Sequence, residues 1–498
     1  PVPRYHALNQ AMSRLRGGRF RMGFKGMDEL QVDHDNILLE SCNTSFQVHF
    51  QVGAHEFAKL YNLAQAVTAP VRAAAVNSPM LLNKRLWHET RIALFQQSVD
   101  TRSSAHRRRG QRARVSFGEQ WVSESILEIF REDLSRLRVV LAGAEEEDSL
   151  AMVARGEAPE LWALRLYNGT VYRWNRPCYG VKDGKAHLRI ENRALPAGPT
   201  LIDELANAAF YFGLMSAVLE EYGPVENIMR FDDARGNFIS AARHGLNAHF
   251  TWVRGAECKA RDLIKETLLP LAREGLKAKK IDEADIDLYL GVLEERVQSG
   301  QTGSQWILRS WAASDADDLR VEERQQELVM QMLDAQKKGG PVHRWELAEM
   351  RRTRPRWHSL LSVGQSMMTD IFTVSPDDLI DLAASKMEWE RVRHIPVENE
   401  EGKLVGLVSH RDILRLMGRS DSSTLAVRDV MTRDVITVGP RTRTVEALRL
   451  MREEGVGCLP VVQDEHLVGM LTESVFLDVA FTLIRDELNQ ADRDRSGD

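Results

Sequence analysis

Apolar and polar side chains alternate along residues 187–193, whose sequence is HLRIENR. In an extended strand, alternate side chains point to opposite faces. Leu188, Ile190 and Asn192 would therefore share one face. The opposite face would carry four ionisable side chains, those of His187, Arg189, Glu191 and Arg193. The pattern alone leaves two interpretations open, a solvated face and a functional site.

Residues 161–215 surround this strand and predict a compact motif, in the order strand, strand, glycine-containing connection, strand, turn and helix. Pro196, Gly198 and Pro199 predict the turn, because proline fixes φ and glycine adopts conformations that other residues resist. Thr200 or Asp203 can then cap a helix that begins near residue 202.

A second alternating stretch lies within residues 36–52, where His49 occupies a polar position between Val48 and Phe50. A lone histidine on a strand is either a hydrogen-bonded structural residue or a ligand, and both interpretations stay open. Residues 231–238 predict a turn, and Gly245 predicts a helix end. Helical spacing of apolar residues predicts helices near 55–75, 116–137, 202–221, 257–276, 282–298 and 315–337.

The composition is typical of a globular protein of two or three domains. Of 498 residues, 43% are hydrophobic and 28% are charged, and the net charge is −6. This charge gives no general attraction to nucleic acid or to anionic membranes. No apolar run approaches the roughly 18 residues that would span a membrane. We therefore expect neither kind of partner.

The four cysteines are widely spaced and form no C-x-x-C pattern, so we expect reduced thiols in a cytoplasmic protein. The dense basic run at residues 106–114 would either contact phosphates or form a solvated loop. We assign it no role in nucleic-acid binding.

An internal repeat with a period of about 63 residues occupies residues 359–485. The segments MMT, FTV, HIPV and LVGLVS recur as VMT, ITV, CLPV and LVGMLT. Each copy predicts strand, helix, strand, strand and helix. This arrangement resembles a tandem pair of CBS domains.

The resemblance to CBS domains implies a site for an adenine nucleotide, either AMP or ATP. In that family a hydroxyl and an acid of a Gly-h-h-Ser/Thr-x-x-Asp motif hold the phosphate and the ribose. The first copy has Ser409 and Asp412 at these positions, whereas the second keeps Thr472 without the acid. One intact site is therefore expected, unless the pair is purely structural or dimerising.

Three blocks in residues 36–310 resemble the glutamate–cysteine ligase family, in particular its plant and bacterial carboxylate–amine ligase branch. They are NTSFQVHFQV with AVNSPM and the later Arg91, then the long block NGTVYRWNRPCYGVKDGKAHLRIENRALPAGPTLIDELANAAFYFGL, and finally AARHGL with GQTGSQWIL. The resemblance implies a fold like that of glutamine synthetase, a curved and mostly antiparallel sheet with helices outside. Its enzymes use ATP to phosphorylate the γ-carboxyl of glutamate, and an amine then displaces the phosphate.

The resemblance also assigns roles to individual residues. Glu191 and His49 match metal ligands, with Mg²⁺ expected and Mn²⁺ an alternative, and Arg193 matches a catalytic arginine that contacts phosphate. Arg91 matches an arginine that grips the substrate carboxylate, and Arg243 is a weaker candidate for an anion contact. Hard oxygen ligands and fixed cations are what phosphoryl transfer requires.

One expected element is missing. The family's first strand carries a Glu-x-Glu pair that completes the metal site, and we find no such strand before His49. The chain also starts at Pro1 without an initiator Met. We therefore expect an N-terminally truncated product that by itself is inactive, or a protein that has lost part of the metal site.

These observations together predict an α+β catalytic domain at 1–315, a helical linker at 316–358, and α/β CBS repeats at 359–424 and 425–490. The function expected is ATP-dependent amide formation between the γ-carboxyl of glutamate and an amine through an acyl phosphate, regulated by adenine nucleotide at the CBS pair. Cysteine is the amine expected, as in glutathione biosynthesis. A homodimer through the CBS pairs is also expected. The alternative is a catalytically inactive, nucleotide-sensing regulatory or scaffold protein.

Overall fold

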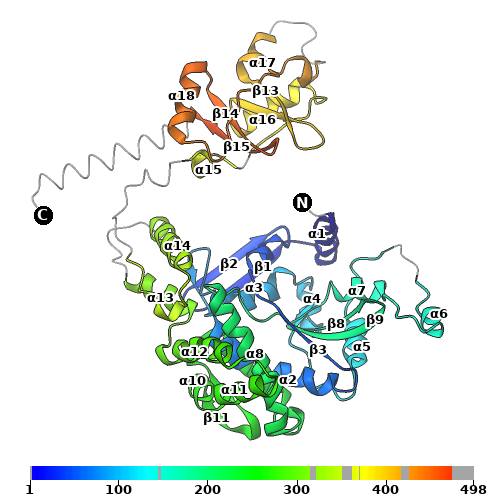
Figure 1. Ribbon diagram of the computed structural model, residues 1–498. Coiled ribbons are helices and arrows are strands. Elements are labelled where there is room, and N and C mark those ends of the chain that lie inside the picture. Colours follow the sequence, from blue (N-terminus) through cyan, green and yellow to red (C-terminus); the bar gives the residue numbers. More distant parts are fainter. Residues whose placement is uncertain are drawn as a thin grey trace, which may run out of the picture. The chain divides into compact units, whose positions relative to one another are not determined.

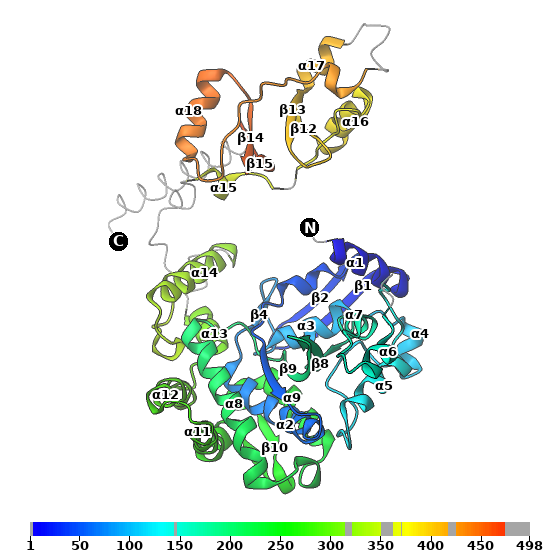
Figure 2. The same ribbon diagram turned by 45° about the vertical axis from the view of Figure 1, so that its right-hand side comes forward.

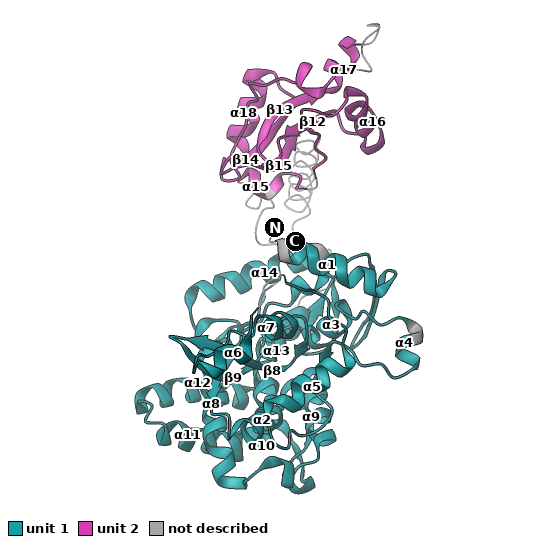
Figure 3. Ribbon diagram, turned by 90° about the vertical axis from the view of Figure 1, so that its right-hand side faces the viewer, with its two compact units in different colours: residues 1–351 teal, residues 352–498 magenta. Residues whose placement is uncertain are grey.

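The computed structural model describes residues 3–143, 147–313, 321–349, 362–369, 371–416 and 425–473. The chain divides into two compact units, Pro1–Arg351 and Arg352–Asp498 (Figure 3). Unit 1 mixes helices with small sheets around a large apolar core. Unit 2 contains the two copies of the internal repeat.

A three-stranded antiparallel sheet lies in unit 1, with the strand order β3 (Val48–Val52), β9 (Lys185–Asn192) and β8 (Asn175–Lys182) (Figure 1). Asp183 and Gly184 join β8 to β9, with φ angles of 52° and 72°. Two residues with positive φ form the type of turn that favours a tight hairpin. The sheet resembling that of glutamine synthetase remains a prediction beyond these strands.

Helix α2 (Phe57–Ala75) covers the face of this sheet that carries Ile190 and Asn192. Asn192 Nδ2 donates to Thr68 Oγ1 of α2 at 2.9 Å and to Asn175 Oδ1 of β8 at 3.0 Å. Every residue of α2 except Lys59 is buried. The alternation predicted for residues 187–193 is therefore confirmed, because one face packs into the core and leaves the charged side chains on the other.

Outer helices complete the core of unit 1. Helix α8 (Leu201–Tyr222) packs against α2, and α11 (Leu269–Ala278) and α12 (Glu283–Ser299) pack on α8 from outside (Figure 2). Helix α8 is long and apolar enough to span a membrane, but 61% of its most apolar window is buried by these neighbours. Thr200 caps α8, as one of the two predicted residues, and its Oγ1 accepts from the Asp203 N–H.

Three predicted elements are wrong in type or extent. Residues 162–168 form helix α7 (Trp162–Asn168) and not a strand, because Ala, Leu and Arg favour helix and no β-branched residue is present. Residues 231–244 form helix α9 (Phe231–His244) in place of the predicted turn. The helix predicted at 116–137 is restricted to α5 (Ile126–Arg136), which starts at a capping box of Ser125 and Glu128.

The N-terminal part contains helix α1 (Pro3–Arg16) and a hairpin of β1 (Phe20–Lys25) and β2 (Glu29–His34). Two strands therefore precede the one that carries His49, in residues to which the sequence analysis assigned no element. Phe20, Met22 and Phe24 alternate as buried residues, which is the pattern of a strand. The acids of β2 are Glu29 and Asp33, so these strands do not supply a Glu-x-Glu pair.

The other elements of unit 1 are shorter or connect those above: β4 (Met80–Leu81), β5 (Lys84–Arg85), β6 (Val115–Ser116), β7 (Tyr172–Arg173), β10 (His249–Thr251), β11 (Glu257–Lys259), α3 (Thr90–Ser98), α4 (Ser104–Arg108), α6 (Ser149–Ala154), α10 (Ala260–Leu263), a π-helical turn (Ile264–Leu268), α13 (Gly303–Ala313), α14 (Val321–Lys338) and the 3₁₀ turns η1 (Leu38–Cys42), η2 (Val225–Asn227), η3 (Gly245–Asn247), η4 (Val253–Gly255) and η6 (Val342–Arg344).

Unit 2 contains two similar halves. The first has α16 (Ile380–Glu390), β12 (His394–Glu398), β13 (Leu404–Ser409) and α17 (His410–Leu416). The second has α18 (Thr444–Glu454), β14 (Cys458–Gln463) and β15 (His466–Thr472). The short turns α15 (Val363–Ser366) and η9 (Val427–Asp429) precede the halves.

The two halves exchange the segments that precede them. Val363 and Met367 pack into the core of the second half, and Met368 pairs with Met470 of β15. Val427 and Met431 pack into the core of the first half, and Thr432 pairs with Leu407 of β13. Each core is therefore built from both repeats.

Candidate active site

Three ionisable residues lie side by side across the central sheet. The register pairs His49 of β3 with Glu191 of β9, and Glu191 with Arg176 of β8. Directly paired residues in antiparallel strands project from the same face. The row His49–Glu191–Arg176, hereafter the charged row, thus runs across the face opposite α2.

Glu191 is the centre of the charged row and is only 1% exposed. Its Oε2 accepts from Arg176 Nε at 2.5 Å, and its Oε1 lies 3.8 Å from Arg193 Nε and 4.0 Å from His49 Nε2. A buried carboxylate needs such partners, because an isolated charge in the interior is strongly disfavoured. One carboxylate therefore holds two arginines and a histidine around it.

Several N–H groups beside Glu191 remain unused among the described residues. Arg193 Nε and Nη1 and Arg189 Nε are buried without a hydrogen-bond partner. Burial lowers the pKa of Arg193, and the nearby Arg176 lowers it further, whereas Glu191 raises it. Buried donors without acceptors are costly, so an anion that accepted hydrogen bonds from these groups would be stabilised on this face.

His49 is the accessible end of the charged row, with 43% of its side chain exposed. Burial lowers its pKa, and this effect outweighs the opposing attraction of Glu191. The neutral imidazole is therefore favoured over the charged form, and a neutral imidazole can accept a proton.

The structure adds two site residues that the sequence analysis did not single out. The sequence analysis missed Arg176, although the position of the hairpin turn at Asp183–Gly184 would have predicted it. In a two-residue hairpin Lys182 pairs with Lys185, and six residues further along each strand Arg176 pairs with Glu191. Glu40 of η1 is close enough to interact electrostatically with Arg193, and burial raises the pKa of Glu40. No regular pattern around Glu40 in the sequence indicates this position.

The two predicted substrate arginines lie elsewhere. Arg91 is 5% exposed, donates from Nε to Glu89 Oε1 at 3.1 Å, and donates from Nη2 to the Ala194 carbonyl at 2.6 Å. Arg91 therefore holds the chain directly after Arg193. Arg243 is exposed at the end of α9, with its guanidinium 4.7 Å from the centre of the Trp87 ring. Its predicted contact with an anion remains a prediction.

The residues expected to bind a metal do not form a complete set. No group of three or more His, Cys, Asp or Glu side chains suited to a metal ion occurs in the described part of the chain. His49 and Glu191 are adjacent, but both oxygens of Glu191 face cationic groups. This arrangement does not fit Mg²⁺ or Mn²⁺, which require several oxygen ligands.

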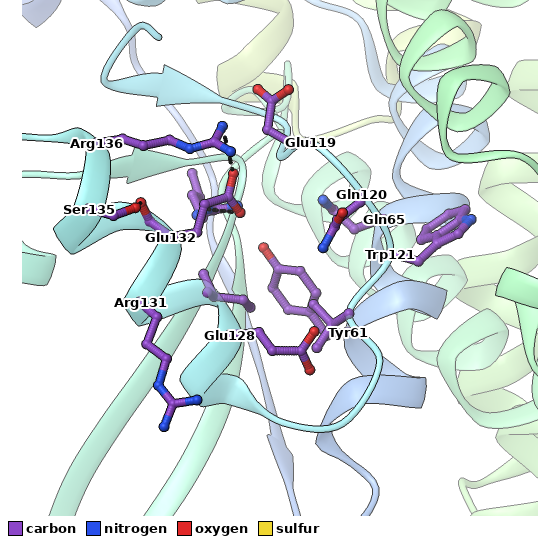
Figure 4. Close-up of a pocket in the computed structure, with 13 residues that line it drawn as sticks. Tyr61, Gln65, Glu119, Gln120, Trp121, Glu128, Arg131, Glu132, Ser135 and Arg136 are labelled. Atoms are coloured by element: carbon purple, nitrogen blue, oxygen red, sulfur yellow. Dashed lines mark hydrogen bonds and ion pairs between the residues drawn. The ribbon is translucent and has the colours of Figure 1, made fainter. Parts of the chain in front are cut away.

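A cavity of about 410 Å³ lies on the α2 side of the sheet, between α5, α2 and the loop around Trp121 (Figure 4). Tyr61 and Gln65 of α2 line it, together with charged residues of α5 that are largely paired, such as Glu132 with Arg173. It includes none of the predicted site residues. The charged row and this cavity are therefore separate.

The predicted nucleotide site of unit 2 lies where β13 meets α17. Asp412 Oδ2 accepts from the Ser409 N–H at 2.9 Å and from Ser409 Oγ at 2.6 Å. Thr472 ends β15 at the equivalent position of the second half, opposite Cys458. The hydroxyl and the acid of the motif are thus held together in the first half.

Comparison with known proteins supports two family assignments. The model of glutamate–cysteine ligase family 2 matches residues 1–332, and the model of the CBS domain matches residues 362–419 and 427–480. Both predicted resemblances are confirmed. The CBS pair also confirms that the C-terminal part of the chain has an α/β repeat.

Individual relatives match short parts of the chain. An inosine-5′-monophosphate dehydrogenase of Methanocaldococcus jannaschii is 38% identical over 132 residues, which is 26% of this chain and 25% of that protein. The CBS domain-containing protein YhcV of Bacillus subtilis is 35% identical over 111 residues, 22% of this chain and 79% of that protein. The chain thus spans about a quarter of the length of the dehydrogenase.

Among solved structures, a putative acetoin utilization protein (AcuB) of Vibrio cholerae is 30% identical to this chain, with a TM-score of 0.25. The match covers 26% of this chain and 97% of that protein. CBSX2, solved in complex with AMP, is 30% identical with a TM-score of 0.23, over 25% of this chain and 98% of that one.

Proposed function

The chain belongs to glutamate–cysteine ligase family 2, and from that premise we propose that unit 1 is an ATP-dependent ligase that joins the γ-carboxyl of glutamate to an amine. Family membership indicates a carboxylate–amine ligase. Glutamate as the acid, cysteine as the amine and a role in glutathione biosynthesis are parts of the proposal.

The observation that supports this proposal most directly is the set of unpartnered guanidinium N–H groups beside a buried carboxylate. Arg189 and Arg193 present buried donors, and Arg176 lies in the same face of the sheet. Fixed cations of this kind stabilise the charge of a phosphoryl group during its transfer. Glu191 keeps Arg176 and Arg193 in place, so that they need not reorganise when an anionic substrate arrives.

In the proposed reaction, a γ-carboxylate oxygen of glutamate attacks the terminal phosphorus of ATP, and ADP leaves. The amine nitrogen then attacks the acyl carbon, inorganic phosphate leaves, and the nitrogen loses a proton. Neutral His49, at the accessible end of the charged row, is suited to accept that proton. Arg91 positions the backbone after Arg193 through the Ala194 carbonyl.

A divalent metal ion such as Mg²⁺ would neutralise the triphosphate of ATP. His49 and Glu191 alone do not complete a site for it within the described ranges, so we assign no step to the metal. The same observation favours a second candidate function. In that alternative, unit 1 is catalytically inactive and serves as a scaffold for nucleotide sensing by unit 2.

For unit 2 we propose binding of AMP or ATP at Ser409 and Asp412, with Thr472 as the partial counterpart in the second half. The match to the CBS domain and the presence of AMP in the CBSX2 structure support this assignment. A cytoplasmic homodimer that associates through its CBS pairs is the assembly we propose.

The test is phosphate release by the full chain in the presence of ATP, Mg²⁺, glutamate and a panel of amines that includes cysteine. We expect release that requires both glutamate and an amine, with the amide product identified by mass. Glu191→Gln should lower turnover at least about 100-fold, because Arg176 and Arg193 lose the carboxylate that positions them.

Lys185→Met is the matched control, since Lys185 is exposed at the other end of the same strand. It should retain wild-type turnover. If the folded wild-type protein releases no phosphate with any amine, the ligase proposal fails and the scaffold alternative stands. Unchanged turnover in Glu191→Gln would remove the charged row from the mechanism.

A further inference from the structure

Arg72 of α2 is a buried cation on the side of the helix that faces the sheet. Thr68, four residues earlier on the same face of α2, contacts Asn175 and Asn192. Arg72 is 0% exposed, and its guanidinium carbon lies 3.6 Å from the centre of the Phe238 ring. The ring engages one face of the planar guanidinium group, whereas the N–H groups point outward in its plane. None of the three nitrogens has a hydrogen-bond partner among the described residues.

The carboxylate of Glu89 acts electrostatically on Arg72 but is already engaged by other groups. Its Oε1 accepts from Arg91 Nε at 3.1 Å and from Ser78 Oγ at 2.7 Å, and its Oε2 accepts from the Asn77 N–H at 3.0 Å. Arg91 also acts on Arg72, as a like charge. Two buried arginines therefore share one buried carboxylate, which leaves one positive charge in excess.

Arg72 keeps its charge at neutral pH in spite of its burial. Burial lowers the pKa of Arg72 to about 9, Glu89 opposes this shift, and Arg91 adds to it. A buried charge without a counter-charge is strongly destabilising, and unmade hydrogen bonds add to that cost. An anion at the edge of the guanidinium group would remove both costs together.

A second buried donor contacts the same aromatic ring as Arg72. Trp174 is 1% exposed, and the centres of the Trp174 and Phe238 rings lie 5.5 Å apart. Its Nε1 likewise has no hydrogen-bond partner within the described ranges. Trp174 also directly precedes Asn175, which donates to Thr68 Oγ1 one turn before Arg72. The indole N–H is therefore a candidate second donor to an anion bound by Arg72.

We propose that Arg72 binds a halide ion inside unit 1, with the Trp174 N–H as a second donor. An anion in this fully buried place must give up its hydration, and a singly charged ion of one atom gives up less than sulfate or phosphate does. The edges of neighbouring aromatic rings carry partial positive charge, which also favours an anion. Bromide should bind more tightly than chloride, because the larger ion is less strongly hydrated.

This halide site is separate from the charged row. Arg72 belongs to α2, which covers the opposite face of the sheet, and Arg193 is not among the groups that act on it. The inference does not depend on the proposed ligase reaction. Its test therefore needs no turnover.

The measurement is thermal unfolding of the full chain by calorimetry in sodium bromide, chloride or gluconate at equal ionic strength. Gluconate is too large and too strongly hydrated to enter the interior. Binding to the folded state raises the midpoint of unfolding, so we expect it to be at least about 3 °C higher in bromide than in gluconate. Chloride should give a smaller increase.

Two variants and a matched control assign the effect to this site. Arg72→Met removes the charge and keeps a long apolar side chain, so the difference between bromide and gluconate should fall below about 1 °C. Trp174→Phe keeps a ring without the N–H and should reduce the difference by about half or more. Lys59→Met is the control, since Lys59 is the exposed cation of the same helix, and it should keep the full difference.

Crystals of the full chain soaked in bromide give the direct structural test. Anomalous scattering should show bromide within hydrogen-bonding distance of the Arg72 guanidinium group. Water alone beside Arg72, or bromide beside Arg193 alone, would overturn the inference. So would an absent difference in the wild type or an equal difference in Arg72→Met. If Arg72→Met does not fold, the bromide position and Trp174→Phe decide. A protein without ligase activity that still binds bromide at Arg72 would contradict the proposed function and leave this inference standing.

Discussion

At the scale of single residues, burial decides what the charged groups of this protein do. Glu191 lies on the polar face of an alternating strand, yet it is 1% exposed. The surrounding arginines and His49 make that burial tolerable, and Glu191 in turn orients them. The alternation predicted which face of the strand carries Glu191, whereas its depth of burial depends on the neighbouring strands β3 and β8.

His88 offers a residue-scale prediction of pH dependence. It is 8% exposed, and burial, with a smaller effect of His244, lowers its pKa to about 4. The unfolded chain therefore binds a proton between pH 6.5 and 4 that the folded protein does not bind. Stability is fully present above pH 6.5 and is lost as the pH falls, by up to about 3 kcal/mol from this group.

The measurement is urea-induced unfolding at pH 7.5 and pH 4.5. The loss of unfolding free energy at the lower pH should be smaller in His88→Gln than in the wild type, by about 2–3 kcal/mol. His55→Gln, at an exposed histidine before α2, is the matched control and should keep the wild-type dependence. An equal dependence in His88→Gln would contradict the assignment.

The sequence predicted the strand that contains Glu191 and the charged face of that strand. It could do so because the alternation of side chains and the residues that form turns are local features. It did not identify Arg176 or Glu40, since their roles depend on which strand lies beside β9 and on where η1 folds back. The family resemblance assigned Arg91 to a substrate contact, which stays a prediction, and the structure adds the contacts of Arg91 with Glu89 and Ala194. Such partners are set by tertiary packing.

At the scale of elements, long helices with clear periodicity were predicted well and short ones were not. Helices α2 and α8 begin and end within two residues of their predicted limits. Helix α7 was predicted as a strand and α9 as a turn, because short segments with Gly, Asp or alternating apolar residues fit more than one pattern. Tertiary contacts determine the outcome for such segments.

The crossing of α8 and α11 gives a prediction at this scale. The helices approach so closely that a Cβ added to Gly275 of α11 would overlap the carbonyl oxygen of Gly213 of α8. Gly275→Ala should therefore lower the free energy of unfolding by at least about 2 kcal/mol, through overpacking. Thermal or urea unfolding of the full chain measures the change.

Gly291 of α12 is the matched control, because it also lies inside a helix but has open space around its Cβ position. Gly291→Ala should leave stability unchanged or raise it by up to about 1 kcal/mol, as expected for alanine in place of glycine in a helix. Equal effects of the two substitutions would show that helix propensity, and not the close crossing, governs Gly275.

At the scale of the whole molecule, the chain combines a ligase-family unit with a CBS pair, each with its own cores. The internal repeat made this organisation visible in the sequence. A repeat is a strong signal because it depends on similarity within the chain and not on uncertain local propensities.

The nucleotide site gives the prediction at this scale. Asp412→Asn should weaken AMP or ATP binding to the full chain at least about tenfold, because the hydrogen bonds expected from its carboxylate are charge-assisted. Asparagine retains an oxygen that can accept from Ser409, so the start of α17 is preserved. Calorimetry with each nucleotide measures the change.

Asp381→Asn is the matched control, since Asp381 is an exposed aspartate in the first turn of α16. It should bind both nucleotides like the wild type. Binding unaffected by Asp412→Asn would exclude the first half of unit 2 as the site and direct attention to the half that contains Thr472.

Met367 and Met431 each pack against the core of the other half of unit 2, and this arrangement determines which part of the chain can fold as a separate module. Because each hydrophobic core borrows a segment from the neighbouring repeat, neither repeat contains the sequence needed to complete its own interior. If the chain were divided between the two repeats, each repeat would lack residues that pack into its hydrophobic core. The smallest piece that could be transplanted into another protein is therefore the entire pair, starting before Ser362.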